Sequence, residues 1–167
     1  MKTILYMAVT ANGYIAKEND DTSWITLEEW NSYSAMVRRA GNLVIGHRTY
    51  DILTKQPEFS EFSEVKIVIV SNNDFQTLSP NHVIAKTPKE ALNILKDFAE
   101  VIVAGGGSLS ASFMQENLID EIYLDIEPIM LGKGIKLFAA GDFEIKLQLL
   151  EVKTISRDEI QLHYKVL

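Results

Sequence analysis

The amino-acid sequence predicts an α/β fold in which helices flank a mixed, mostly parallel β-sheet that ends in a β-hairpin. Two observations carry this prediction. Short apolar segments alternate with amphipathic helical segments through most of the 167 residues, and this order is typical of a parallel sheet with helices on its faces. The last two apolar segments follow each other directly around the polar turn 156–158, as the two strands of a hairpin do.

The composition is that of an ordinary globular domain, with 47% apolar and 23% charged residues, so we expect one domain over residues 1–167. The net charge of −7 argues against a broad surface for nucleic acid or anionic membranes. It leaves room for an anionic ligand held by local cations and backbone N–H groups. We therefore expect neither a nucleic-acid partner nor a membrane partner.

Cysteine is absent from the chain, which excludes disulfides, thiolate catalysis and cysteine-ligated zinc. The three histidines, His47, His82 and His163, are scattered, and we predict no catalytic metal because no pair has the spacing of metal ligands. The first apolar run lacks a cleavage-site pattern and is too short to span a membrane. The expected location is the cytoplasm.

The first half of the chain contains one strongly marked helix between strands. Thr3–Val9 is apolar at nearly every position, as in a strand covered on both faces, and a short strand resumes at 14–16. The next helix begins at Thr26, because Thr26 and Glu29 have the spacing of a capping box, and Gly41 ends it. Further strands are expected at 42–45, 65–70 and 82–85, with a helix beginning near 46–49 and a polar loop at 55–64.

The second half repeats the alternation before the hairpin. Thr87-Pro88 opens a helix with a second capping box. Val101–Ala104 is a strand that Gly105-Gly106-Gly107 turns into another helix. A half-buried strand at 119–126, a loop at 131–134 and the two hairpin strands at 145–155 and 159–166 complete the prediction.

Four of the predicted strands end in polar or glycine-rich segments, at 10–13, 46–49, 71–73 and 105–108. Parallel strands bring such ends to one edge of a sheet, where ligands bind. The sharpest is Gly105-Gly106-Gly107, followed by Ser108. Glycine lets the backbone approach an anion closely, and the following helix directs N–H groups toward it. The segment matches neither the Rossmann nor the Walker pattern. The alternative is a tight turn without a ligand.

Two other strand ends carry groups that hold phosphates. In Gly46-His47-Arg48-Thr49, a guanidinium, an imidazole and a hydroxyl could bind phosphate, although exposed polar residues at a helix start would look the same. Ser71-Asn72 is weaker, because such residues also favour plain turns. All three segments together favour a dinucleotide over a single phosphate.

Glu29 is the candidate acid. It shares a helix face with Tyr33, and a carboxyl against aromatic walls would have a raised pKa and could donate a proton. Alternatively, Glu29 only closes the capping box onto the Thr26 backbone. Trp24 is either packing or pocket wall. Asp125 shares a strand face with Glu127, a pattern that also suits a solvated face.

Taken in order, the segments TANGYIA, SWIT, VIGHRTYDIL, KIVIVSN, VIVAGGGSLSASFM and LIDEIYLDIEPIMLGKGIKLF resemble the dihydrofolate reductase-like superfamily. In particular they resemble the reductase domain of riboflavin-biosynthesis deaminase-reductases and its freestanding bacterial relatives. The resemblance covers nearly the whole chain. It implies a three-layer α/β/α sandwich, a homodimer and NADPH as the cofactor.

The resemblance also implies roles for individual residues. The pyrophosphate would be cradled by Gly105, Gly106, Gly107 and Ser108, phosphates would be held by Gly46, His47, Arg48 and Thr49, the adenosine end would lie near Ser71 and Asn72, and the nicotinamide would be flanked by Ala8 and Ile15. Glu29 is nearest to the acid that folate reductases carry on their first helix. Trp24, Tyr33 and Asp125 are the predicted substrate-binding residues.

The implied reaction is the reduction of a ribosylamino-pyrimidine to its ribitylamino form, the step of 5-amino-6-(5-phosphoribosylamino)uracil reductase. The chain contains no deaminase domain and none of its zinc cysteines, so the substrate is left open as a pyrimidine or pteridine type of compound. Two alternatives stand beside this reading: a dihydrofolate reductase, and an NADPH-binding protein without turnover.

Overall fold

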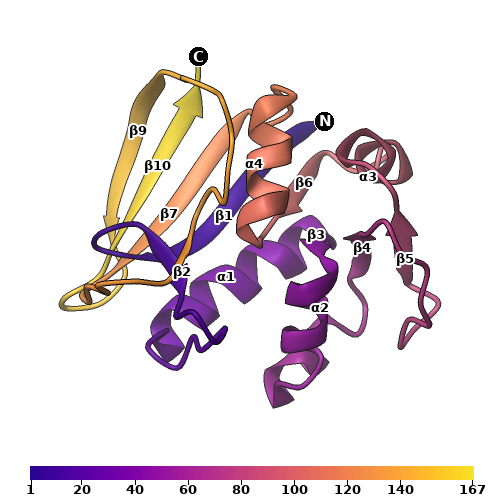
Figure 1. Cartoon of the computed structure of the whole chain (residues 1–167), viewed down its shortest axis with the longest axis horizontal. Coiled ribbons are helices and arrows are strands. Elements are labelled where there is room, and N and C mark those ends of the chain that lie inside the picture. Colours follow the sequence, from indigo (N-terminus) through magenta and orange to yellow (C-terminus); the bar gives the residue numbers. More distant parts are fainter.

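An eight-stranded sheet forms the middle of the computed structural model, which describes residues 1–167 (Figure 1). Its strands are β1 (Lys2–Thr10), β3 (Asn42–Gly46), β4 (Lys66–Val70), β5 (His82–Ala85), β6 (Glu100–Val103), β7 (Glu121–Glu127), β9 (Leu147–Thr154) and β10 (Ile160–Val166). They lie in the order β5-β4-β3-β6-β1-β7-β10-β9. The first six strands in that order are parallel, and β10 pairs antiparallel with both β7 and β9. The predicted mixed sheet with its terminal hairpin is confirmed.

Helices cover the sheet on both faces and create two separate apolar cores. One core contains Ile4 and Tyr6 of β1 beneath α1 (Leu27–Ala40) and α2 (His47–Leu53). The other contains Leu5, from the opposite face of the same strand, beneath α3 (Pro88–Ile94) and α4 (Gly107–Gln115). Successive side chains of a strand point to opposite faces, so the apolar run of β1 serves both cores. The fold is a three-layer α/β/α sandwich.

The local signals for the first helix act as the sequence indicates. The Thr26 hydroxyl accepts a hydrogen bond from the N–H of Glu29 at 3.1 Å, which satisfies one of the free amides at the start of α1. Gly41 ends the helix with φ +70°, a left-handed conformation that glycine adopts without strain. These two residues fix where α1 begins and ends beside the sheet.

The sequence prediction missed two short elements. Residues 55–64 were expected to be a polar loop, but a 3₁₀ helix, η1 (Pro57–Phe62), lies there. It forms because Phe59 and Phe62 pack edge-on against one another, and against the rings of Tyr50 and Tyr33 respectively. The second element is β8 (Ile135–Lys136), just after the predicted loop, which pairs with β2 (Tyr14–Ala16) in a two-stranded sheet.

The edge strand β9 differs from the rest of the sheet because each of its residues is exposed. Leu147, Leu149, Leu150 and Val152 present 40–54% of their surface to solvent. None of the helices combines the length and apolarity needed to cross a membrane.

Candidate functional site

A cavity of about 650 Å³ opens at the carboxyl edge of the parallel strands, within the usual range for small-molecule sites. Fourteen of the predicted site residues line it: Ala8, Ile15, Glu29, Tyr33, Gly46, His47, Arg48, Thr49, Ser71, Asn72, Gly105, Gly106, Gly107 and Ser108. The structure thus brings the predicted cofactor residues and the candidate acid to one cavity, as expected if parallel strands share an edge. Trp24 and Asp125 do not line it.

The glycine turn between β6 and α4 forms one wall of the cavity. Gly105 has φ +79°, the peptide bond between Gly105 and Gly106 is cis, and the carbonyl of Gly105 accepts a hydrogen bond from the N–H of Gly46 at 3.0 Å. Gly106 is the N-cap of α4, and no side chain caps this helix. The first amides of α4 therefore remain available to an anion.

Gly107 has no room for a side chain. A Cβ there would lie 2.4 Å from the carbonyl oxygen of Lys136, which belongs to β8. The N–H of Ala139 also donates to the carbonyl of Gly107 at 3.1 Å. The close approach of residues 136–139 therefore requires glycine at this position.

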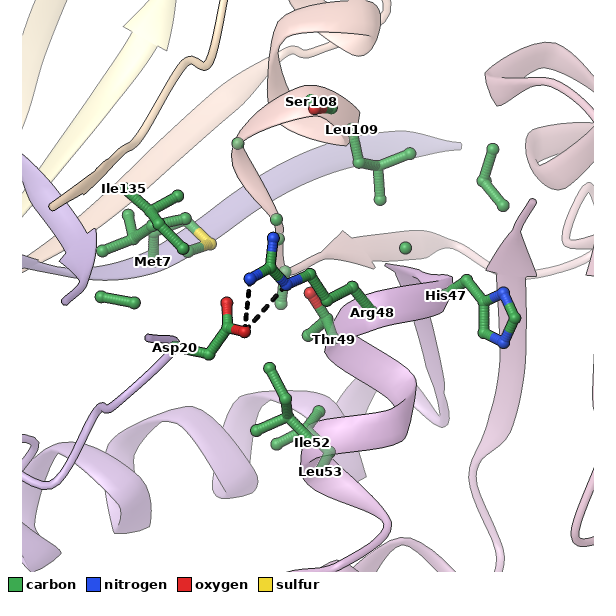
Figure 2. A pocket seen from close by; sticks show the side chains of 18 of the residues that line it. Met7, Asp20, His47, Arg48, Thr49, Ile52, Leu53, Ser108, Leu109 and Ile135 are labelled. Atoms are coloured by element: carbon green, nitrogen blue, oxygen red, sulfur yellow. Dashed lines mark hydrogen bonds and ion pairs between the residues drawn. The ribbon is translucent and has the colours of Figure 1, made fainter. Parts of the chain in front are cut away.

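Polar side chains at the start of α2 line the cavity, and Thr49 lies beside the glycine turn whereas His47 points away from it (Figure 2). The ring of His47 stacks on Phe75 with centroids 3.8 Å apart. Arg48 is already engaged: its Nε and Nη2 atoms donate to one carboxylate oxygen of Asp20 at 2.9 and 2.5 Å. The side chain of Arg48 is still 69% exposed, so the pair lies at the mouth of the cavity and a phosphate there would compete with Asp20 for the guanidinium.

The opposite end of the cavity is aromatic and acidic. Tyr6, Trp30 and Tyr33 line it together with Glu29, which is only 4% exposed. Burial raises the pKa of the Glu29 carboxyl well above its ordinary value, and the nearby charges of Asp125, Glu127 and Glu159 raise it further. Glu29 therefore holds a proton at a pH where an exposed glutamate has lost it.

The capping-box alternative for Glu29 is answered by a residue from the other half of the chain. The backbone N–H of Thr26 donates to Oε1 of Glu127 at 3.2 Å, across 101 residues of sequence. Glu127 thus takes the place that the side chain of Glu29 has in a reciprocal capping box. Only the backbone N–H of Glu29 takes part in the cap, and its carboxyl lies at the cavity instead.

Asp125 reaches the cavity only through Tyr6. Its two carboxylate oxygens accept hydrogen bonds from the Tyr6 hydroxyl at 2.5 Å and from Nε2 of Gln161 at 2.8 Å. Burial raises the pKa of Asp125 to about 6, against the opposing effect of these two hydrogen bonds. Asp125 and Glu127 are each 1% exposed, so the interpretation of their strand face as solvated is wrong.

Several residues of the cavity wall were not singled out from the sequence. Met7, Asp20, Lys86 and Ile135 all line the cavity. Lys86 follows β5 directly, forms an ion pair with Asp74 and donates to the carbonyl of Asn72 at 3.4 Å. Its position directly after a predicted strand is the sequence feature that could have indicated its place in the cavity.

Trp24 is half-buried, and its indole N–H has no hydrogen-bond partner. No group of three or more histidine, aspartate or glutamate side chains is arranged to hold a metal ion.

Comparison with known proteins agrees with this architecture. The model of the RibD C-terminal domain family matches residues 1–160. The chain is 32% identical over 171 residues to the uncharacterized protein YwjB of Bacillus subtilis (strain 168), covering 98% of this chain and 97% of that one. It is 28% identical over 132 residues to dihydrofolate reductase type 1 of Escherichia coli, covering 77% and 78% of the two chains.

Among solved structures, a putative riboflavin biosynthesis protein from Shewanella sp. PV-4 superimposes with a TM-score of 0.82 at 22% identity, covering 100% of this chain and 99% of that one. This likeness supports the fold, and the match of the family model over nearly the whole sequence supports membership. The chain belongs to the RibD C-terminal domain family.

Proposed function

We propose that the protein is an NADPH-dependent reductase of a small pyrimidine or pteridine type of compound, related to 5-amino-6-(5-phosphoribosylamino)uracil reductase of riboflavin biosynthesis. The observation that carries the proposal is one cavity with an uncapped, glycine-built helix start at one end and a buried, proton-holding carboxyl at the other. Family membership supports the same reaction class.

The residues present suit a dinucleotide. The glycine turn leaves no side chain between the first amides of α4 and the cavity, so Gly105 to Ser108 would hold the pyrophosphate. The groups at the start of α2 would hold phosphates, and Ser71 and Asn72 would lie by the adenosine end. Ala8 and Ile15, on the opposite side, would flank the nicotinamide, which supplies a hydride when the cofactor is bound.

The protein's own part in the reaction is to exclude water and to provide a proton. Reduction of a carbon–nitrogen or carbon–oxygen double bond takes up a hydride at carbon and one proton at the heteroatom. Glu29 is the group at the cavity that holds such a proton, and its O–H bond breaks as the proton passes to the substrate. Trp30 and Tyr33 beside it keep the carboxyl desolvated, which favours the protonated form.

Titration of the protein with NADPH and with NADH tests the cofactor half of the proposal. We expect NADPH to bind at sub-millimolar concentration. If neither nucleotide binds in that range, the reductase function is wrong. If NADPH binds tightly but is not oxidised with any of a panel of pteridines, pyrimidines and flavin precursors, a binding protein without turnover is the better description.

Dihydrofolate reduction is a second candidate function. It is favoured by the similarity to dihydrofolate reductase type 1 together with the carboxyl that α1 presents to the cavity. The test is a direct assay of NADPH oxidation with dihydrofolate. Turnover comparable to that with a ribosylamino-pyrimidine would favour this candidate, and its absence would leave the pyrimidine reductase.

A homodimer in the cytoplasm is part of the same proposal. The unpaired edge of β9, with its exposed Leu147, Leu149, Leu150 and Val152, supports a contact between two copies, because bare edge strands with apolar side chains are normally covered. One chain has a mass of 18.8 kDa, and light scattering on the purified protein should give twice that mass. Replacing Leu149 by Lys should then yield monomers.

A further inference from the structure

Four carboxyl groups lie buried together behind the aromatic end of the cavity. Glu29, Asp125, Glu127 and Glu159 are 4%, 1%, 1% and 4% exposed, and none of them forms an ion pair. Buried carboxylates of like charge cannot all ionise, so such a group retains protons. Three of the four, Asp125, Glu127 and Glu159, do not line the cavity, and these three have no part in the function proposed above.

The carboxyls of Glu127 and Glu159 are buried neighbours. Oε2 of Glu159 is buried and has no hydrogen-bond donor. An ionised carboxylate only accepts hydrogen bonds, so two of them bond to each other only when one is protonated. Burial raises the pKa of Glu127 to about 7, and the neighbouring carboxyl of Glu159 adds to the increase, against the opposing hydrogen bond from the Thr26 backbone.

The surroundings of the cluster offer little to neutralise it. From β1 and α1 come the hydroxyls of Tyr6 and Ser32, the latter bonded to Tyr6 at 2.9 Å, and the ring of Tyr33. From β10 comes the amide of Gln161, which bonds to Asp125. Lys153 of β9 is the cation whose charge acts on the cluster, and it acts on Asp125. The negative charge of the cluster is therefore felt at Glu29.

We propose that Glu127 and Glu159 share one proton and act as positioning residues that hold the carboxyl of Glu29 in its protonated, proton-donating form. The inference rests on the proposed reductase function for its purpose. The shared proton itself concerns only the cofactor-free protein. Glu127 has a second task, because the same carboxyl anchors the start of α1 through the Thr26 N–H and so fixes the place of Glu29.

The experiment is a ¹³C NMR titration of the cofactor-free protein with glutamate labelled at Cδ. Glu29, Glu127 and Glu159 are assigned from their Gln variants, which keep the size of the side chain. In the wild type we expect Glu127 to titrate near 7. In Glu159→Gln its midpoint should fall by about one pH unit, because the like-charged partner is gone. The midpoint of Glu29 should fall in both Glu127→Gln and Glu159→Gln, and most in the double variant.

Glu151→Gln is the matched control, because Glu151 is exposed on β9 and should leave both midpoints unchanged. An unchanged Glu127 midpoint in Glu159→Gln would overturn the shared proton. An unchanged Glu29 midpoint in both single variants would overturn the coupling to the cavity. A separate NADPH titration keeps the two proposals apart. If the wild type does not bind NADPH, the reductase function is wrong, but the NMR result on the shared proton is unaffected.

Discussion

The two ends of the cavity are built from different material. The end around Gly105, Arg48 and Ser71 consists of backbone turns and polar side chains at strand ends, open to solvent at the Arg48–Asp20 pair. The end around Glu29 consists of aromatic rings and carboxyls that are almost fully buried. An anionic ligand needs free amides and mobile cations, whereas a proton donor needs exclusion of water. The contrast matches the two tasks of a reductase.

The largest expected effect comes from removing the proton at the buried end. Glu29→Gln should lower turnover by about 100-fold or more, the usual contribution of a general acid, with NADPH affinity unchanged. Steady-state kinetics and a binding titration measure the two quantities separately. Glu28→Gln is the control, because Glu28 is exposed in the same helical turn. Full activity of Glu29→Gln would mean that the proton comes from elsewhere.

The glycine end should fail in the opposite way. Gly107→Ala places a Cβ 2.4 Å from a backbone oxygen, so the backbone must move, at a cost of about 1–3 kcal/mol. We expect at least about tenfold weaker NADPH binding and a lower Tm, measured by fluorescence titration and calorimetry. Gly132→Ala, where nothing lies within 4 Å, should match the wild type. Normal NADPH affinity in Gly107→Ala would show that the turn does not cradle the cofactor.

Arg48 distinguishes a 2′-phosphate contact from a contact to the shared pyrophosphate. Arg48→Ala should weaken NADPH binding by about 10- to 100-fold, as for a hydrogen bond to a charged group, and NADH binding less. Asp20→Asn removes the carboxylate that now engages the guanidinium, so this variant should bind NADPH more tightly. Equal losses for both nucleotides in Arg48→Ala would assign Arg48 to the pyrophosphate.

The smallest effect concerns stability and pH. The folded pKa values of Glu29, Asp125 and Glu127 all lie above their ordinary values. The folded state therefore binds more protons than the unfolded chain, and stability is lost as pH rises through these pKa values. Tm should fall by a few degrees between pH 5.5 and pH 8, and by less in Glu127→Gln. A Tm that rises over this range would contradict the buried, protonated cluster.

The two ends of the cavity could be predicted from the sequence to different extents, because their residues are separated by different lengths of chain. The glycine turn and the start of α2 are local features, so consecutive residues such as Gly105 to Ser108 reveal them, and the parallel topology brings them together. The buried end is assembled from distant segments: Thr26 meets Glu127 across 101 residues and Tyr6 meets Gln161 across 155. No local pattern indicates such pairs, so the capping box at Thr26 and Glu29 looked complete on its own.

The segment between β2 and α1 is held at both ends and near its middle. Pairing with β8 fixes its start, the Thr26–Glu127 hydrogen bond fixes its end, and Asp20 is tied to Arg48 from the far side of the cavity. The anchors come from β8, β7 and α2, and neither apolar core contains a residue of the segment itself. Evolution can therefore change the residues within this segment, which reach the cavity through Thr22 and Ile25, and so retune what the cavity accepts without rebuilding the domain.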